Sequence, residues 1–151
     1  MKRLILTVSF LLFSLPAHSM TLEDILAMQD TPEGVVIEIL EADEYDLIDL
    51  LPVIDDATRR LRERYPGLPI ALVSHGREQF ALTSKNQKKH EKSHKGIQQL
   101  VANNVDVHVC GTHASWFDIS PEEYPDYIDV SPAGPAQIND YVALGYILLK
   151  L

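Results

Sequence analysis

Short runs of β-branched residues alternate along this chain with segments whose apolar residues recur every three or four positions. Five runs are expected strands: residues 34–40 (GVVIEIL), 68–74 (LPIALVS), 105–109 (VDVHV), a short run around Val130, and 145–151 (GYILLKL). The expected helices are residues 45–65, the run through Ile97, Leu100 and Val101, and residues 137–144. Strands separated by helices imply βαβ units. We therefore expect a single three-layer α/β/α domain with a mainly parallel five-stranded sheet.

The N-terminus has the organisation of a secretory signal peptide. Two basic residues open the chain, an apolar run follows, and Pro16 ends it. Ala17 and Ser19 supply the small residues that a signal peptidase reads. The apolar run is about a dozen residues, too short to span a bilayer. We expect a signal peptide at 1–19 and a single domain at 20–151, hence a periplasmic or secreted protein; the alternative is a retained N-terminal anchor.

The exported chain is expected to be strongly acidic. The whole sequence has 13 basic and 22 acidic residues and a net charge of −9 at pH 7. Loss of Lys2 and Arg3 with the signal peptide leaves 11 basic residues and a net charge of −11. Such a surface repels nucleic acid and anionic lipid, and no second apolar stretch is long enough to cross a membrane. We therefore expect neither nucleic acid nor, after cleavage, a membrane as a partner.

The chain has one cysteine, Cys110, so it can form no internal disulfide. For the same reason it has no resolving cysteine, which excludes dithiol reduction within one chain. An oxidising compartment disfavours idle exposed thiols. Cys110 is therefore expected to be a free thiol that is buried, pairs between chains or carries chemistry.

Chemistry-bearing side chains follow the ends of the expected strands, where ligands bind in open parallel sheets. Cys110 ends the third strand, His113 follows it, and His75 follows the second strand. We predict these three as catalytic residues, because a nearby imidazole or helix N-terminus favours the reactive thiolate. The residues expected to line the pocket around them are Gly76, Gly111, Thr112, Trp116 and Gly134. The alternatives are a structural, buried Cys110 and a Trp116 packed in the core.

Other candidates carry weaker signals. His90 and His94 are spaced to bind a metal from one helix face, but they lie in the lysine-rich segment 84–95, which we expect to be a solvated, mobile loop. His108 alternates with valines and is expected to face the other side of its strand or a polar niche. The acidic residues within 122–129 are expected to form a solvated face. No metal ligands and no cofactor are assigned.

The stretch VDVHVCGTHASWFDISPEEYPDYIDVSPAG, followed by a helix and GYILLKL, resembles the DsrE/DsrF-like family, as does the earlier ALVSHG. The resemblance covers residues 34–151 and implies that residues 20–151 form a DsrE-like domain. It implies a compact α/β sandwich that often assembles into homo-oligomers. For the sulfur-relay members it also implies a cysteine that carries a persulfide and passes sulfur to a partner protein. Carried onto this chain, the resemblance makes Cys110 the sulfur carrier and His75 a pocket residue.

Three functions remain open from the sequence. In the first, Cys110 accepts sulfane sulfur from a donor and hands it to an acceptor protein. In the second, Cys110, His113 and His75 bind a soft metal such as Cu(I) or Zn²⁺. In the third, the chain is an oligomeric domain whose pocket binds a small molecule without catalysis. Whether the protein is an enzyme is therefore undecided by the sequence.

Overall fold

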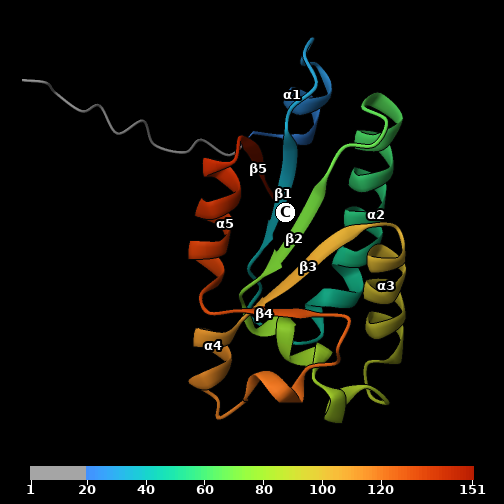
Figure 1. The fold of residues 1–151 in the computed structure, drawn as a ribbon. Helices are drawn as coiled ribbons and strands as arrows, with labels where there is room; N and C mark the ends of the chain where they lie inside the picture. The colour runs from blue at the N-terminus through green and yellow to red at the C-terminus, as the bar shows by residue number, and fades with distance from the viewer. Residues whose placement is uncertain (1–19) are drawn as a thin grey trace, which may run out of the picture.

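A five-stranded sheet in which every neighbouring pair of strands is parallel forms the centre of the molecule (Figure 1). The structure is a computed structural model that describes residues 20–151, so the predicted signal peptide lies outside the described residues. In spatial order the strands are β4 (Asp129–Ser131), β3 (Val105–Cys110), β2 (Ile70–Ser74), β1 (Gly34–Ile39) and β5 (Tyr146–Lys150). The predicted parallel five-stranded sheet is confirmed.

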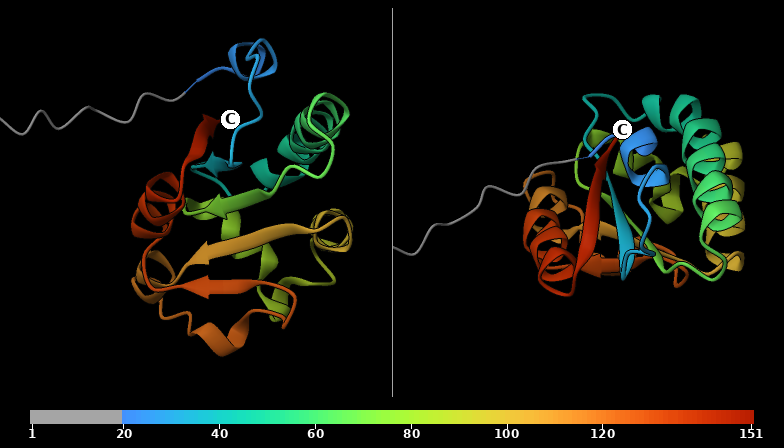
Figure 2. Two further views of the ribbon diagram at one scale, coloured as in Figure 1. Left: turned by 45° about the horizontal axis from the view of Figure 1, so that its top comes forward. Right: turned by 90° about the horizontal axis from the view of Figure 1, so that it is seen from above.

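Helices cover both faces of this sheet, as Figure 2 shows. One face packs against α2 (Asp46–Arg64) and α3 (Glu91–Ala102), with the short α1 (Leu22–Leu26) beside α2. The other face packs against α5 (Gly134–Ala143). The chain runs outward from β1 to β4 and then returns through α5 to β5, which lies beside β1. The architecture is therefore the predicted α/β/α arrangement.

The strands are almost continuously apolar because parallel strands are covered on both faces. On β1, Val35 and Ile37 belong to the large core beneath α2 and α3, whereas Val36 belongs to the smaller core beneath α5. Glu38 breaks this pattern with a charge. Side chains alternate along a strand, so Glu38 lies on the α5 side, near the carboxyl end of β1.

The segment 84–95 is more ordered than the sequence predicted. Residues Ser84–Asn86 form η2, and α3 begins at Glu91, so the expectation of a loop across the whole segment was wrong. The reason is amphipathic packing: His94 and Ile97 are buried while the lysines stay outside. The helix expected at 137–144 also begins earlier, at Gly134, with Pro135 in its first turn, where a missing N–H is harmless.

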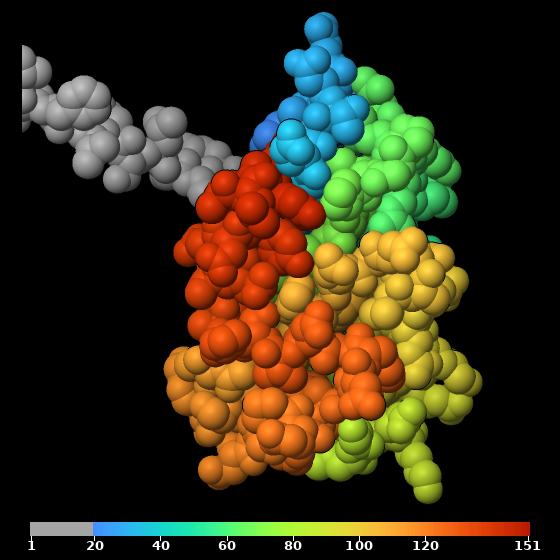
Figure 3. Space-filling view, viewed as in Figure 1, coloured from blue at the N-terminus to red at the C-terminus, as the bar shows by residue number. Residues whose placement is uncertain are grey.

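Short elements gather at the carboxyl edge of the sheet. There η1 (Arg77–Leu82) follows β2 and α4 (Gly111–Ser115) follows β3, while η3 (Pro121–Glu123) lies between α4 and β4 along the chain. In the space-filling view of Figure 3, the orange segments between β3 and α5 cover this end of the molecule below the red α5. Among the described residues, no helix is both long and apolar enough to cross a membrane.

Candidate functional site

Cys110 is the last residue of β3 and the N-cap of α4. Its Sγ accepts a hydrogen bond of 3.4 Å from the backbone N–H of His113. Its own backbone N–H donates to Oε1 of Gln79 at 3.0 Å. The residue is 4 % exposed. The thiol is thus held at the carboxyl edge of the sheet with a backbone N–H directed at the sulfur.

A cavity of about 380 Å³ opens beside this thiol. The walls of this cavity are mainly apolar or aromatic. The lining residues are Leu40, His75, Cys110, Thr112, His113, Trp116, Ala133 and Pro135. The three residues predicted as catalytic therefore line one cavity. Trp116 is 73 % exposed, so it lies at the rim of the cavity. The alternative expectation, that Trp116 packs in the core, was wrong.

His75 is held by a carboxylate that the sequence analysis did not single out. Nε2 of His75 is 2.8 Å from Oε1 of Glu38, and Nζ of Lys150 is 2.8 Å from Oε2 of the same carboxylate. Burial raises the pKa of Glu38, but the hydrogen bonds from Lys150 and His75 outweigh burial and leave this pKa below its ordinary value. Glu38 is therefore ionised at neutral pH and can only accept a hydrogen bond. Nε2 of His75 must carry the proton.

His113 is oriented in a similar way by a backbone group. Its Nδ1 lies 2.7 Å from the carbonyl oxygen of His75, which can only accept, so Nδ1 carries the proton. The ring packs among Phe80, Trp116 and Phe117 at centroid distances of 5.4, 5.5 and 5.4 Å. In the neutral ring, Nε2 is then the atom that can accept a proton.

Two buried polar side chains of η1 brace this edge. Oε1 of Glu78 accepts from the Ser74 hydroxyl at 2.7 Å and from the Gly76 N–H at 3.0 Å, and its Oε2 accepts from the Glu41 N–H at 2.7 Å. Nε2 of Gln79 donates to the Gly76 carbonyl at 2.9 Å, while its Oε1 accepts from the Cys110 N–H. The sequence reasoning missed both residues, and their one signal was a place directly after a strand end.

Of the five residues predicted to line the pocket, three lie at the thiol cavity and two lie elsewhere. Thr112 and Trp116 line the thiol cavity. Gly134 adjoins it, because a Cβ at this position would lie 2.6 Å from Cβ of His75 and 3.3 Å from Cβ of Cys110. Gly76 packs instead against Glu78 and the backbone of Glu41.

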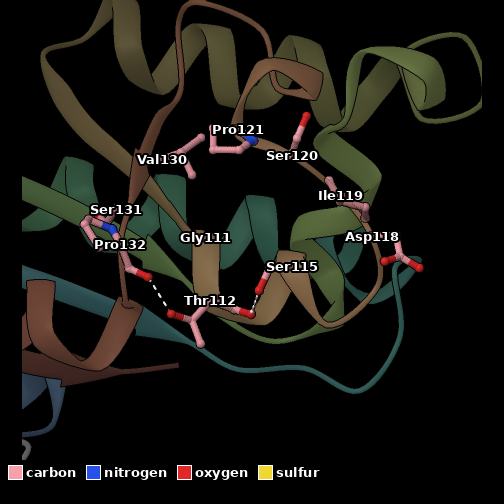
Figure 4. A pocket seen from close by; sticks show the side chains of 10 residues that line it. All are labelled: Gly111, Thr112, Ser115, Asp118, Ile119, Ser120, Pro121, Val130, Ser131 and Pro132. Atoms are coloured by element: carbon pink, nitrogen blue, oxygen red, sulfur yellow. Dashed lines mark hydrogen bonds between the residues drawn. The ribbon is translucent and has the colours of Figure 1, made fainter.

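Gly111 faces a second and larger cavity of about 680 Å³, on another side of α4 (Figure 4). The Thr112 hydroxyl there donates to the Pro132 carbonyl at 2.6 Å, and the Ser115 hydroxyl donates to the Thr112 carbonyl at 2.8 Å. These hydroxyl protons are already engaged within the protein. The lining includes neither a thiol nor an imidazole. The smaller thiol cavity is therefore the better candidate for chemistry.

The other histidines lie apart from this site. Nε2 of His94 donates to the Ala81 carbonyl at 3.0 Å, and its Nδ1 accepts from the Tyr127 hydroxyl at 2.6 Å. His90 is 6 % exposed and lies near Glu44. Both histidines are therefore buried, contrary to the expected solvated loop. Across residues 20–151, no three His, Cys, Asp or Glu side chains gather closely enough to hold a metal ion.

His108 occupies the polar niche that its alternation predicted. It lies beneath α5, where its Nε2 is 2.8 Å from the Tyr141 hydroxyl and its Nδ1 is 3.3 Å from the Ser131 hydroxyl. Ser131 donates onward to Oε1 of Gln137 at 3.0 Å. Burial lowers the pKa of His108 and raises that of Tyr141 to about 12. This network is neutral at ordinary pH and structural in character.

Comparison with known proteins bears on the fold alone. No protein-family model and no curated protein matches the sequence. Among solved structures, the protein of unknown function MTH1491 from Methanobacterium thermoautotrophicum matches with a TM-score of 0.61 and 17 % identity, over 78 % of this chain and 97 % of that one. The ychN protein from E. coli matches with a TM-score of 0.55 and 18 % identity, over 79 % and 99 %. The chain thus has the α/β fold of these two proteins, with a mainly parallel five-stranded sheet and helices on both of its faces.

Proposed function

We propose that this protein is an exported DsrE/DsrF-like thiol protein that carries sulfane sulfur as a persulfide on Cys110. The main support is the cavity in which the Cys110 thiol, two oriented imidazoles and a backbone N–H directed at sulfur come together. The DsrE-like fold adds support, since it agrees with the resemblance of the stretch around Cys110.

The transfer needs no second cysteine in the chain. The Cys110 thiolate attacks the outer sulfur of a donor R–S–SH, a bond forms between Sγ and that sulfur, and the S–S bond of the donor breaks. The donor leaves as R–S⁻, which takes up a proton from solvent, and Cys110 holds the persulfide. An acceptor thiolate then attacks the outer sulfur and releases Cys110 as a thiolate. The sulfane sulfur changes carrier without any external oxidant or reductant.

The cavity also favours a class of donor. Its walls are mainly apolar, and the chain as a whole is strongly acidic. An anionic donor is therefore repelled at long range and poorly solvated in the cavity. A small organic persulfide with an uncharged R group is the best fit, and a sulfur donor or acceptor protein meets the exposed Trp116 at the rim.

Intact-mass spectrometry tests the proposal. The wild-type protein, treated with an organic persulfide R–S–SH whose R group is uncharged and then desalted, is expected to gain about 32 Da, the mass of one sulfur atom. Cys110→Ser is expected to gain nothing, and a thiol acceptor should remove the adduct from the wild type. A folded wild-type protein that gains no such mass over the donor concentration range would contradict sulfur carriage.

A non-catalytic binding module is the second candidate, because the cavity is apolar and has an indole at its rim. Such a module would bind small apolar molecules equally well in wild type and in Cys110→Ser. Trp116 is the only tryptophan of the chain, so its fluorescence reports occupancy directly. Equal binding in both proteins, together with an inert thiol, would favour this module over the sulfur carrier.

A further inference from the structure

A charged cluster adjoins the thiol cavity on the α5 side of the sheet. The parallel register of β1 and β5 places Glu38 opposite Lys150. His75, which follows β2, completes the cluster through its 2.8 Å contact with Glu38. The side chains of Glu38 and His75 are 13 % and 11 % exposed, whereas that of Lys150 is largely exposed. A carboxylate is thus kept near the thiol with an imidazole as its buried partner.

This contact fixes which nitrogen of His75 can act on the thiol. Because the ionised carboxylate only accepts, Nε2 of His75 is its donor, and Nδ1 of the neutral ring holds the free electron pair. Within residues 20–151, no protein group hydrogen-bonds to that Nδ1. The hypothetical Cβ on Gly134 would touch Cβ of both His75 and Cys110, so the two side chains leave the backbone at neighbouring points.

We propose that Glu38 is a positioning residue of the thiol site: it holds His75 in the tautomer whose Nδ1 accepts the proton of the Cys110 thiol. The S–H bond breaks, the electron pair stays on Sγ, and the proton forms an N–H bond on His75. The resulting imidazolium lies against the Glu38 carboxylate, and the thiolate keeps the His113 N–H at 3.4 Å. The inference rests on the proposed function only in that sulfur transfer requires a thiolate.

The rate of iodoacetamide alkylation as a function of pH tests this role without any sulfur donor. Glu38→Gln keeps the shape of the side chain and removes its charge. The carboxylate is the charged partner of the imidazolium that takes up the thiol proton, so its loss is expected to raise the midpoint of alkylation by about one pH unit. At a pH below both midpoints, the rate should then fall about tenfold. In a His75→Ala background, Glu38→Gln is expected to have no further effect.

A matched control is present in the same chain. Glu44 also pairs with a lysine, Lys89, and lies 3.6 Å from a histidine, His90, but none of the three lines the thiol cavity. Glu44→Gln is therefore expected to leave the alkylation profile unchanged. Glu38→Asp, which keeps the charge, is expected to restore part of the wild-type rate. If Glu38→Gln does not fold, Glu38→Asp takes its place in the test. The alkylation midpoint of Glu38→Asp should then lie above that of the wild type.

The outcomes separate this proposal from sulfur carriage. A folded Glu38→Gln with the wild-type midpoint, or an equal shift in the His75→Ala background, would overturn the positioning role whether or not a persulfide forms. A shift that vanishes without His75 supports the role. If the same wild-type protein then gains no sulfur from the persulfide R–S–SH, the proposed function fails while the positioning of the thiol stands.

Discussion

The carbonyl oxygen of His75 accepts a hydrogen bond from Nδ1 of His113 at 2.7 Å. This contact joins the end of β2 to α4, and it links the two histidines whose rings line the thiol cavity. It also fixes the tautomer of His113, because a carbonyl has no proton to give. This hydrogen bond therefore helps to hold the two sides of the cavity together, and its contribution to the free energy of unfolding can be measured.

Replacement of His113 by Phe is expected to lower the free energy of unfolding by about 1 kcal/mol, the usual net value of one hydrogen bond. The new ring keeps the packing against Phe80 and Trp116 but cannot donate to the His75 carbonyl. His113→Ala removes the aromatic packing as well and is expected to cost more. Urea unfolding of the three proteins gives both differences. Equal stability of the Phe variant and the wild type would show that the bond contributes nothing.

Cys110→Ser is expected to fold with little loss of stability and to lose all sulfur carriage. The serine hydroxyl is close in size to the thiol and can accept the His113 N–H that Sγ accepts now. Its burial therefore costs less than the 1–3 kcal/mol of an unpaired hydroxyl, taken as an order of magnitude. Thermal unfolding and the mass assay measure the two effects. A large drop in melting temperature with no activity to lose would indicate a structural cysteine.

Gly134→Ala is expected to disturb the thiol cavity as well as the fold. Its methyl group would lie 2.6 Å from Cβ of His75, and overpacking of this kind costs about 1–3 kcal/mol. Gly96→Ala is the matched control, because its methyl group would lie 2.6 Å from Cδ1 of Leu51, away from the cavity. Both variants should unfold at lower urea concentration, but only Gly134→Ala should change the alkylation rate of Cys110. If Gly134→Ala and Gly96→Ala alkylate Cys110 at the same rate, α5 does not pack closely enough on the thiol site to affect it.

Export of the protein is a prediction that residues 1–19 alone support. Processing is expected after Ser19, because Ala17 and Ser19 satisfy the small-residue rule. N-terminal sequencing of protein recovered outside the cytoplasm should then begin at Met20. Recovery of a membrane-bound protein that begins at Met1 would instead indicate a retained anchor.

The meeting of Cys110, His75 and His113 could be expected from the sequence because parallel strands end at the same edge of a sheet. That expectation needed only the order of strands and helices along the chain. The cavity rim was harder to predict: an aromatic side chain after a strand end fits a core as well as a rim, and Trp116 proved to be exposed.

Glu38 could not be found in the same way. One charged residue inside an apolar strand fits a solvated edge as well as a buried ion pair. Only the folded structure separates the two cases: β5 lies beside β1, and their register pairs Glu38 with Lys150. Local sequence patterns give neither the strand order nor the register. The same limit applies to Gln79, whose role follows from the path of the chain after β2 and not from any spacing in the sequence.

Two buried histidines are expected to make the stability of this protein depend on pH. Burial lowers the pKa of both His94 and His108 below the ordinary value of 6.5. In the unfolded chain both take up protons as the pH falls through about 6.5, while the folded protein excludes them. The free energy of unfolding is therefore highest above pH 7 and falls below it, until the pH reaches the folded-state pKa values.

Urea unfolding between pH 7.5 and pH 5.5 measures this loss, above the range in which most carboxylates titrate. The slope is expected to approach 1.4 kcal/mol per pH unit for each histidine, taken as an order of magnitude. His108→Gln and His94→Gln should each reduce the slope. Tyr141→Phe removes the hydroxyl that contacts His108 but keeps the imidazole, so it should lower stability at every pH and leave the slope in place. A wild-type protein whose stability does not change over this interval would show that the buried histidines are not linked to folding.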